Sequence, residues 1–226
     1  MVAADYTCKH LALPREHMPV IYNGIDLNHF PLAPRRPTSS KEIIIGTAGR
    51  FDPEKGHRVL IRAAAELQAK GYAFRLRIAG SGSLEPEYLH LASELGIADR
   101  LELPGRVEDI AEFYRGLDIF VMPSLFAEGL PLALLGAMAT ELPVVSTTGT
   151  AGATEVIRNG VDGLLVPAGS AGALTAAIEG LLHDSALRRS MGEKARVRVR
   201  EAFTVQAMTH KVARVYRELT SADRSK

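Results

Sequence analysis

Residues Asp118 to Ala139 read DIFVMPSLFAEGLPLALLGAMA and form a complete strand–loop–helix pattern. The first five are a short apolar run typical of a buried strand, and the apolar stretch from Leu132 onward favours a helix. The loop between them carries one carboxylate, Glu128, followed by a glycine and a proline. Doubly wound α/β sheets bind ligands at such loops, because the first amides of the following helix are unpaired and carry partial positive charge.

Apolar runs and helical patterns alternate along the rest of the chain. Strands are expected at 43–48, 74–79, 101–103, 118–122, 143–146 and 163–166, and helices at 55–70, 87–95, 109–114, 132–139, 155–158, 171–182, 186–202 and 205–219. Strands that alternate with helices form parallel βαβ units with right-handed crossovers. We therefore predict an α/β fold, a Rossmann-like doubly wound parallel sheet of about six strands, with ligands at the carboxyl ends of its strands.

The composition limits the class of protein. A chain of 226 residues with 46% hydrophobic and 23% charged residues is typical of a soluble globular protein with a good core. The net charge of +1 predicts no broad basic surface for nucleic acid. The single cysteine, Cys8, excludes an internal disulfide and fits a reducing compartment, and no apolar run is long enough to span a bilayer.

The first forty residues do not follow the alternation of strands and helices. Residues 1–19 predict a short helix, a proline break and a loop, and residues 20–22 predict a short strand. Residues 31–41 are rich in proline, arginine, serine and threonine, which is typical of a linker. We expect the regular domain to begin after this linker.

The turn after the first main strand reads GRFDPEKGH from Gly49 to His57. It brings two cations, Arg50 and Lys55, close to a helix N-terminus. Two cations and unpaired amides suit a diphosphate, although an ordinary solvated turn is the alternative. Residues 79–83 read AGSGS and predict a tight turn. No GxGxxG motif follows the first strand, so a dinucleotide cofactor loses its main support.

Glu128 is the candidate contact to a sugar. A carboxylate accepts two hydroxyl hydrogen bonds in a fixed orientation, which suits a vicinal diol. The alternative is an acid that only stabilises the N-terminus of the following helix through its dipole. The seven histidines have no spacing suited to metal ligands, and no DxD pair stands near a strand end, so no metal site is predicted.

Several runs, taken in their order, resemble the donor-binding C-terminal half of family 4 retaining glycosyltransferases, which have the GT-B fold. The matching runs are VIYNGID at 20–26, the Gly49–Gly56 turn, IAGSG at 78–82, LPGRV at 103–107, PS at 123–124 followed by EG at 128–129, and PVV at 143–145. The resemblance implies that 1–40 hold the tail of an N-terminal domain and an interdomain linker. It implies a nucleotide-sugar-binding domain over 41–202, and a helix over 203–226 that bridges back to the missing domain.

The resemblance also implies roles for single residues at the reacting end of the donor. Arg50 and Lys55 would bind the diphosphate and offset its charge as the nucleotide leaves, with no metal or cofactor. Glu128 would bind sugar hydroxyls, and these three are the candidate catalytic residues. The amides of Gly129 and Leu130 would support the sugar and the phosphate.

A loop with Arg106 and Val107 would cradle the base, and Gly49 and Gly80 are among the residues implied to bind the nucleotide-sugar. Gly136 would stand at the ribose. The implied reaction moves a sugar from a nucleotide-sugar, most often a UDP-sugar, to an acceptor with retention at the anomeric carbon. By analogy the full-length enzyme would work in polysaccharide or lipopolysaccharide synthesis, cytoplasmic, with peripheral membrane contact left open.

The sequence departs from the family motif at two positions. The motif has a second glutamate eight residues after the first, and here that position is Gly136; Glu141 stands where the family has a glycine that ends the helix. Glycine inside a helix and an acid at its C-terminus are both unfavourable, and left-handed backbone there suits glycine better. Losing one charge-assisted hydrogen bond costs roughly 1.5–3 kcal/mol, so we expect weakened donor binding.

The acceptor half of a GT-B enzyme is expected to be absent apart from its tail. Transfer needs both halves to exclude water and to place the acceptor, so the isolated chain is expected to be weakly active or inactive. A degenerate, non-catalytic module that binds a nucleotide-sugar or a protein is the alternative function. An unrelated dehydrogenase ranks below both, because the dinucleotide turn is missing.

Overall fold

A six-stranded, fully parallel sheet forms the centre of the protein, in a computed structural model that describes residues 2–11, 14–32, 42–126 and 129–223. The strand order is β3-β2-β1-β4-β5-β6. The strands are β1 (Ile43–Ala48), β2 (Phe74–Ala79), β3 (Leu101–Glu102), β4 (Ile119–Met122), β5 (Val144–Thr147) and β6 (Leu164–Val166). This order is that of the Rossmann fold, so the predicted fold class is confirmed.

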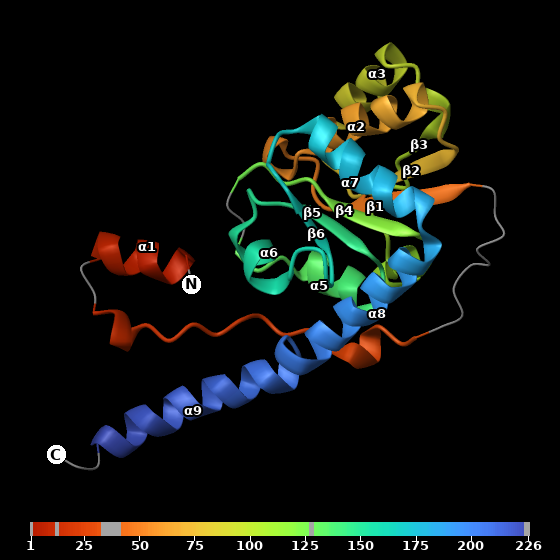
Figure 1. Ribbon diagram of the computed structural model, residues 1–226. Helices are drawn as coiled ribbons and strands as arrows, with labels where there is room; N and C mark the ends of the chain where they lie inside the picture. The colour runs from red at the N-terminus through yellow and green to blue at the C-terminus, as the bar shows by residue number, and fades with distance from the viewer. Residues whose placement is uncertain (1, 12–13, 33–41, 127–128, 224–226) are drawn as a thin grey trace.

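Two hydrophobic clusters cover the two faces of the sheet, because successive strand residues point to opposite sides. Ile45 and Val121 pack under α2 (His57–Ala69), α3 (Glu85–Glu94) and α7 (Ala171–His183). Ile44 and Phe120 pack against α4 (Ile110–Arg115), α5 (Leu132–Ala139) and α6 (Ala151–Val156). Figure 1 shows α2, α3 and α7 together on one side of the sheet, and α5 and α6 on the other.

The helix α8 (Ser185–Ala202) joins the two layers. Met191 belongs to the cluster under α7, and Ala195 and Val199 belong to the cluster under α5. Short 3-10 turns over Arg15–His17, Leu27–His29, Pro53–Lys55 and Ala98–Arg100 complete the regular structure.

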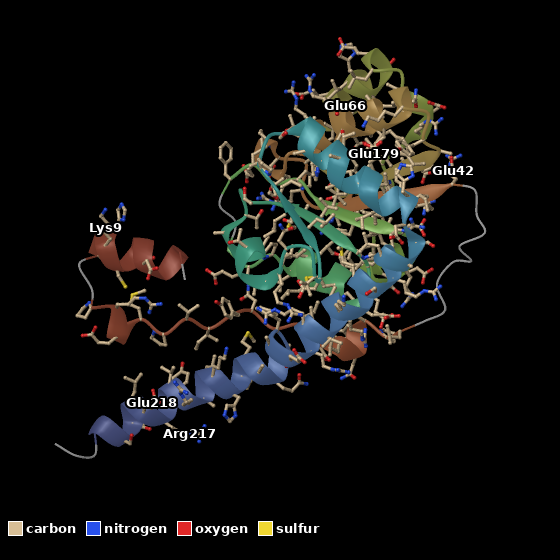
Figure 2. The ribbon with its side chains drawn as sticks, viewed as in Figure 1. Lys9, Glu42, Glu66, Glu179, Arg217 and Glu218 are labelled. Atoms are coloured by element: carbon tan, nitrogen blue, oxygen red, sulfur yellow. The ribbon has the colours of Figure 1, made fainter. Side chains whose placement is uncertain are left out.

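The first and last helices lie away from the sheet. In Figure 1, α1 (Val2–Leu11) and α9 (Val205–Asp223) lie on the same side of the molecule, and α9 continues beyond the domain. Figure 2 shows Lys9 on α1 and Arg217 and Glu218 on α9, all remote from the sheet. None of the helices in the described residues is both long and apolar enough to cross a membrane.

Two predicted elements were wrong. Residues 20–22 form no strand; the entering chain makes only an isolated bridge from Ile25 to Thr204. The turn expected at 155–158 belongs to α6, which begins earlier, at Ala151, and ends at Val156. Glycine is required at position 152 in this helix, because a Cβ on Gly152 would lie 2.1 Å from the carbonyl oxygen of Gly129.

Candidate functional site

The sheet has its topological switch point between β1 and β4. Strand β1 pairs with β2 on one side and with β4 on the other, so the connections leave in opposite directions. Ligands of doubly wound sheets bind in the crevice outside the carboxyl ends of such strands. The loop after β1 begins at Gly49, and the loop after β4 begins at Pro123.

These two loops are fastened to each other. The amide of Leu125 donates to the carbonyl of Glu54 at 2.7 Å. Gly56 has a φ of 69°, and a Cβ there would lie 2.0 Å from the carbonyl oxygen of Pro123. Glycine is therefore required at this position by both backbone conformation and close approach. The crevice consequently has a fixed shape on this side.

A cavity of about 580 Å³, here called the β1–β4 cavity, lies between the two loops. Its lining residues are Thr47, Ala48, Gly49, Arg50, Lys55, His57, Met122, Pro123, Ser124, Pro131, Leu132 and Ala133. It therefore contains both predicted phosphate cations and the start of α5. The buried hydroxyl of Thr147 donates to the carbonyl of Ser124 and supports the far loop.

A second cavity of about 430 Å³, here called the β1–β2 cavity, adjoins the first. It is lined by Ala48, Gly49, Arg50, Ala79, Gly80, Ser81, Arg106, Val107 and Ile110. Three residues from Ala48 to Arg50 belong to both cavities. The residues predicted for the diphosphate and those predicted for the nucleoside thus lie on two sides of one turn.

Gly80 makes the close approach between the loops after β1 and β2. Its φ is 143°, and a Cβ would lie 1.8 Å from the carbonyl oxygen of Gly49. Its amide donates to the carbonyl of Gly105 at 2.8 Å, which brings the loop with Arg106 to the same place. The tight turn predicted at 79–83 therefore forms part of the wall of the β1–β2 cavity.

The cationic side chains are accessible. Arg50 is 74% exposed and pairs with Asp52 at 2.9 Å and with Glu54 at 3.7 Å. Exposed ion pairs of this kind contribute about 0–1 kcal/mol, so a bound anion can displace them. The Lys55 Cδ lies 3.8 Å from the position that a Cβ on Gly49 would occupy. Both cations thus flank the same glycine.

Other predicted site residues are placed differently. Glu128 lies outside the described residues. Gly129 and Leu130 line a third cavity of about 290 Å³, together with Tyr22, Asn23 and other residues of the entering segment and α6. The side-chain amide of Asn23 donates to the carbonyl of Leu130 at 3.1 Å.

Gly136 lies buried in α5 and lines none of the cavities described above. A Cβ on it would lie 2.7 Å from Cε2 of Tyr114 and 3.2 Å from Cε1 of Phe30. A glutamate here would require these rings to move. The ribose role of this position therefore stays a prediction. Glu141 has the left-handed backbone expected after the helix, with a φ of 60°.

Sequence reasoning missed two residues of this site. His57 is 2% exposed, lines the β1–β4 cavity and places Nε2 3.2 Å from the carbonyl oxygen of Arg50. Asn23 was quoted only within the VIYNGID run, yet its side chain reaches the carbonyl of Leu130, 107 residues away. Among the described residues, no group of three or more histidine, cysteine or acidic side chains could hold a metal.

Comparison with known proteins agrees with this geometry. Residues 32–198 match the sequence pattern of the family described as glycosyl transferases group 1. WcaL of Salmonella typhimurium, named for colanic acid biosynthesis, is 32% identical over 216 residues, which are 91% of this chain and 52% of WcaL. CapM of Staphylococcus aureus, named as a capsular polysaccharide biosynthesis glycosyltransferase, is 32% identical over 76% of this chain and 45% of its own.

Solved structures share the fold. Anabaena HepE, crystallised in complex with UDP and glucose, has a TM-score of 0.80 at 23% identity, covering 91% of this chain and 58% of HepE. The chain spans about half the length of the curated relatives it matches. On the family pattern, which covers most of its length, the chain belongs to the glycosyl transferases group 1 family.

Proposed function

We propose that this chain is the donor-binding part of a retaining glycosyltransferase and that it binds a UDP-sugar across the β1–β4 and β1–β2 cavities. The observation that carries the proposal is the shared turn at the switch point, where Gly49 and Arg50 line both cavities. HepE, which has the same fold, was crystallised with UDP and glucose. A diphosphate at this turn would have the nucleoside on one side and the sugar on the other.

The proposed chemistry needs charge compensation at the leaving group. As the sugar–phosphate bond breaks, negative charge grows on the diphosphate. Arg50 and Lys55, together with the unpaired amides at the start of α5, stabilise that charge in the crevice. Glu128 orients the sugar hydroxyls, and Arg106 and Val107 hold the base. An acceptor hydroxyl held by an N-terminal domain attacks the anomeric carbon from the face that the diphosphate leaves and passes its proton to the departing phosphate oxygen, so the configuration is retained.

Titration of the chain with UDP in a calorimeter tests the proposal, with GDP and NAD as competing nucleotides. Arg50→Ala and Lys55→Ala should each weaken UDP binding by about ten- to a hundredfold, because a charge-assisted hydrogen bond is worth roughly 1.5–3 kcal/mol. Arg58→Ala is the matched control, since Arg58 pairs with Glu87 on the surface and lines neither cavity. UDP binding that is unaffected by either cavity cation would contradict the proposal.

The biological setting is proposed from the relatives. WcaL and CapM are named for the synthesis of colanic acid and capsular polysaccharide. We propose that the whole protein adds a sugar to such a surface polysaccharide at the cytoplasmic side of the membrane. Transfer assayed with an N-terminal domain supplied in trans tests this proposal, since the chain covers only half of WcaL.

A non-catalytic module remains the second candidate. Its support is the pair of departures at Gly136 and Glu141, of which the first is packed against Tyr114 and Phe30. Saturable UDP binding with no transfer, even with the N-terminal domain present, would favour this function. UDP release that depends on an acceptor would exclude it.

A further inference from the structure

His57 is a buried imidazole in the wall of the β1–β4 cavity that the proposed function does not use. It is the first residue of α2 and is 2% exposed. Its Nε2 lies 3.2 Å from the carbonyl oxygen of Arg50, seven residues earlier. A carbonyl oxygen can only accept, so Nε2 carries the proton and the tautomer is fixed by this contact.

Two aromatic rings hold the imidazole in place. The centroids of Phe51 and Tyr88 each lie 5.7 Å from that of His57, at interplanar angles of 82° and 85°. The two rings also contact each other at 5.2 Å, and both are buried. Edge-to-face packing of this kind holds the plane of the imidazole. The hydrogen bond to the Arg50 carbonyl then sets which ring nitrogen faces the turn.

The hydrogen bond completes the anchoring of the turn. The amides of Gly49 and Phe51 donate to the carbonyls of Ala79 and Ser81, each at 2.9 Å. Between these two anchors, the Arg50 peptide is held from the other side by His57. The imidazole also lies against Gly49, with Cε1 and Nε2 each 3.9 Å from the position of its absent Cβ.

We propose that His57 is a positioning residue for diphosphate binding, because its Nε2–H fixes the peptide from which the Arg50 side chain extends. The inference rests on the proposed function, in which Arg50 contacts the diphosphate. The exposed Arg50 side chain has only weak surface pairs to orient it, so its direction depends on its backbone. Without the imidazole donor, the Arg50 side chain keeps its charge but is no longer held in the direction of the diphosphate.

Three variants separate the donor from the packing. His57→Phe keeps an aromatic ring and removes the donor, whereas His57→Gln places an amide N–H the same number of bonds from the backbone. Tyr88→Phe is the control, since it keeps the ring that packs on His57. We expect UDP to bind about three- to tenfold more weakly to His57→Phe, the effect of one hydrogen bond. Binding to His57→Gln and Tyr88→Phe should stay close to that of the parent chain.

A double substitution distinguishes positioning from general loosening of the core. If His57 acts through Arg50, then Arg50→Ala should cost less affinity in the His57→Phe background than in the parent chain. A core defect unrelated to Arg50 would make the two losses multiply. If the two losses of affinity multiply, the inference is overturned and the proposed function still holds. The same conclusion follows if His57→Phe binds UDP like the parent chain while Arg50→Ala binds it more weakly.

If the parent chain fails to bind UDP, the proposed function and the positioning role that rests on it are both rejected. A measurement without ligand then tests separately whether His57 holds the turn. Hydrogen exchange at the Phe51 amide, which donates to Ser81, reports the order of the turn. Exchange there should be faster in His57→Phe than in Tyr88→Phe. Equal exchange in the two variants would show that His57 does not hold the turn.

Discussion

Glu141 carries a local backbone cost at the end of α5. Its φ of 60° lies in the left-handed region, which costs an ordinary residue roughly 1–2 kcal/mol and costs glycine little. We expect Glu141→Gly to stabilise the fold by about 1 kcal/mol, which corresponds to a rise in Tm of about 2–4 °C for a chain of this size. Glu141→Ala keeps the backbone cost and should not give this gain. Equal thermal melting of the two variants would contradict the explanation.

Tyr88 gives stability a dependence on alkaline pH. Burial, followed by the charges of Glu87 and Asp52, raises its pKa from 10.0 to about 12. The folded state therefore binds the phenolic proton more tightly than the unfolded state. The stabilisation is complete below pH 10 and is lost as pH rises towards 12. Denaturant unfolding of Tyr88→Phe across this range should show a shallower alkaline loss, and an identical slope would contradict the assignment.

At the scale of elements, two glycines in helix interiors have opposite surroundings. A Cβ on Gly136 in α5 would meet the buried ring of Tyr114 at 2.7 Å, whereas one on Gly180 in α7 would meet nothing within 4 Å. Alanine favours a helix by roughly 1 kcal/mol over glycine, but overpacking a core costs about 1–3 kcal/mol. Gly180→Ala should therefore stabilise the fold and Gly136→Ala should destabilise it. Chemical denaturation of both measures the sign, and two changes in the same direction would refute the argument.

The polar seam between α2 and α7 shows how elements meet outside the core. Figure 2 labels Glu66 on α2 and Glu179 on α7, two helices that contact each other. Glu179 accepts from Lys70 at 2.5 Å and from the hydroxyl of Tyr72 at 2.6 Å, and these hydrogen bonds lower its pKa. Glu66 accepts from Thr175 at 2.7 Å. These contacts join α7 to α2 and to the residues that follow it, on the same face of the sheet.

Element positions could be predicted where the chain carries its own signal. Apolar runs such as 43–48 identified strands because buried parallel strands need continuous apolar residues. The positions of Arg50 and Lys55 at the β1–β4 cavity could be predicted because both residues belong to the turn between β1 and α2. The contact of His57 with Arg50 could not be predicted, because it depends on the left-handed turn at Gly56 and on the Tyr88 ring from α3. Likewise, the close approach of Gly152 in α6 to Gly129 depends on a loop distant in the sequence.

At the scale of the whole molecule, the entering segment passes the start of α9, and the two are joined by a bridge from Ile25 to Thr204 (Figure 1). Tyr22 packs on Phe203 with centroids 5.5 Å apart, and Lys211 lies 5.5 Å over the Tyr22 ring. From the same segment, Asn23 reaches the carbonyl of Leu130. A movement of the entering segment would therefore change the position of the Leu130 carbonyl in the loop that precedes α5. The side-chain amide of Asn23 thus connects the entering segment to the loop that precedes α5.

Gly24 is the residue that lets these segments cross. A Cβ there would lie 2.3 Å from the carbonyl oxygen of Thr204 and 2.6 Å from the amide nitrogen of Val205, and both are backbone atoms that cannot rotate away. We expect Gly24→Ala to break the hydrogen bonds that pair the segments, from Ile25 to Phe203 at 2.9 Å and from Val205 to Ile25 at 3.1 Å. Hydrogen exchange at the two donating amides should then become faster. Asn23→Ala is the control, because it keeps Gly24 and should leave both amides protected. If both variants lose protection, or if neither does, the pairing of the segments does not depend on glycine at position 24.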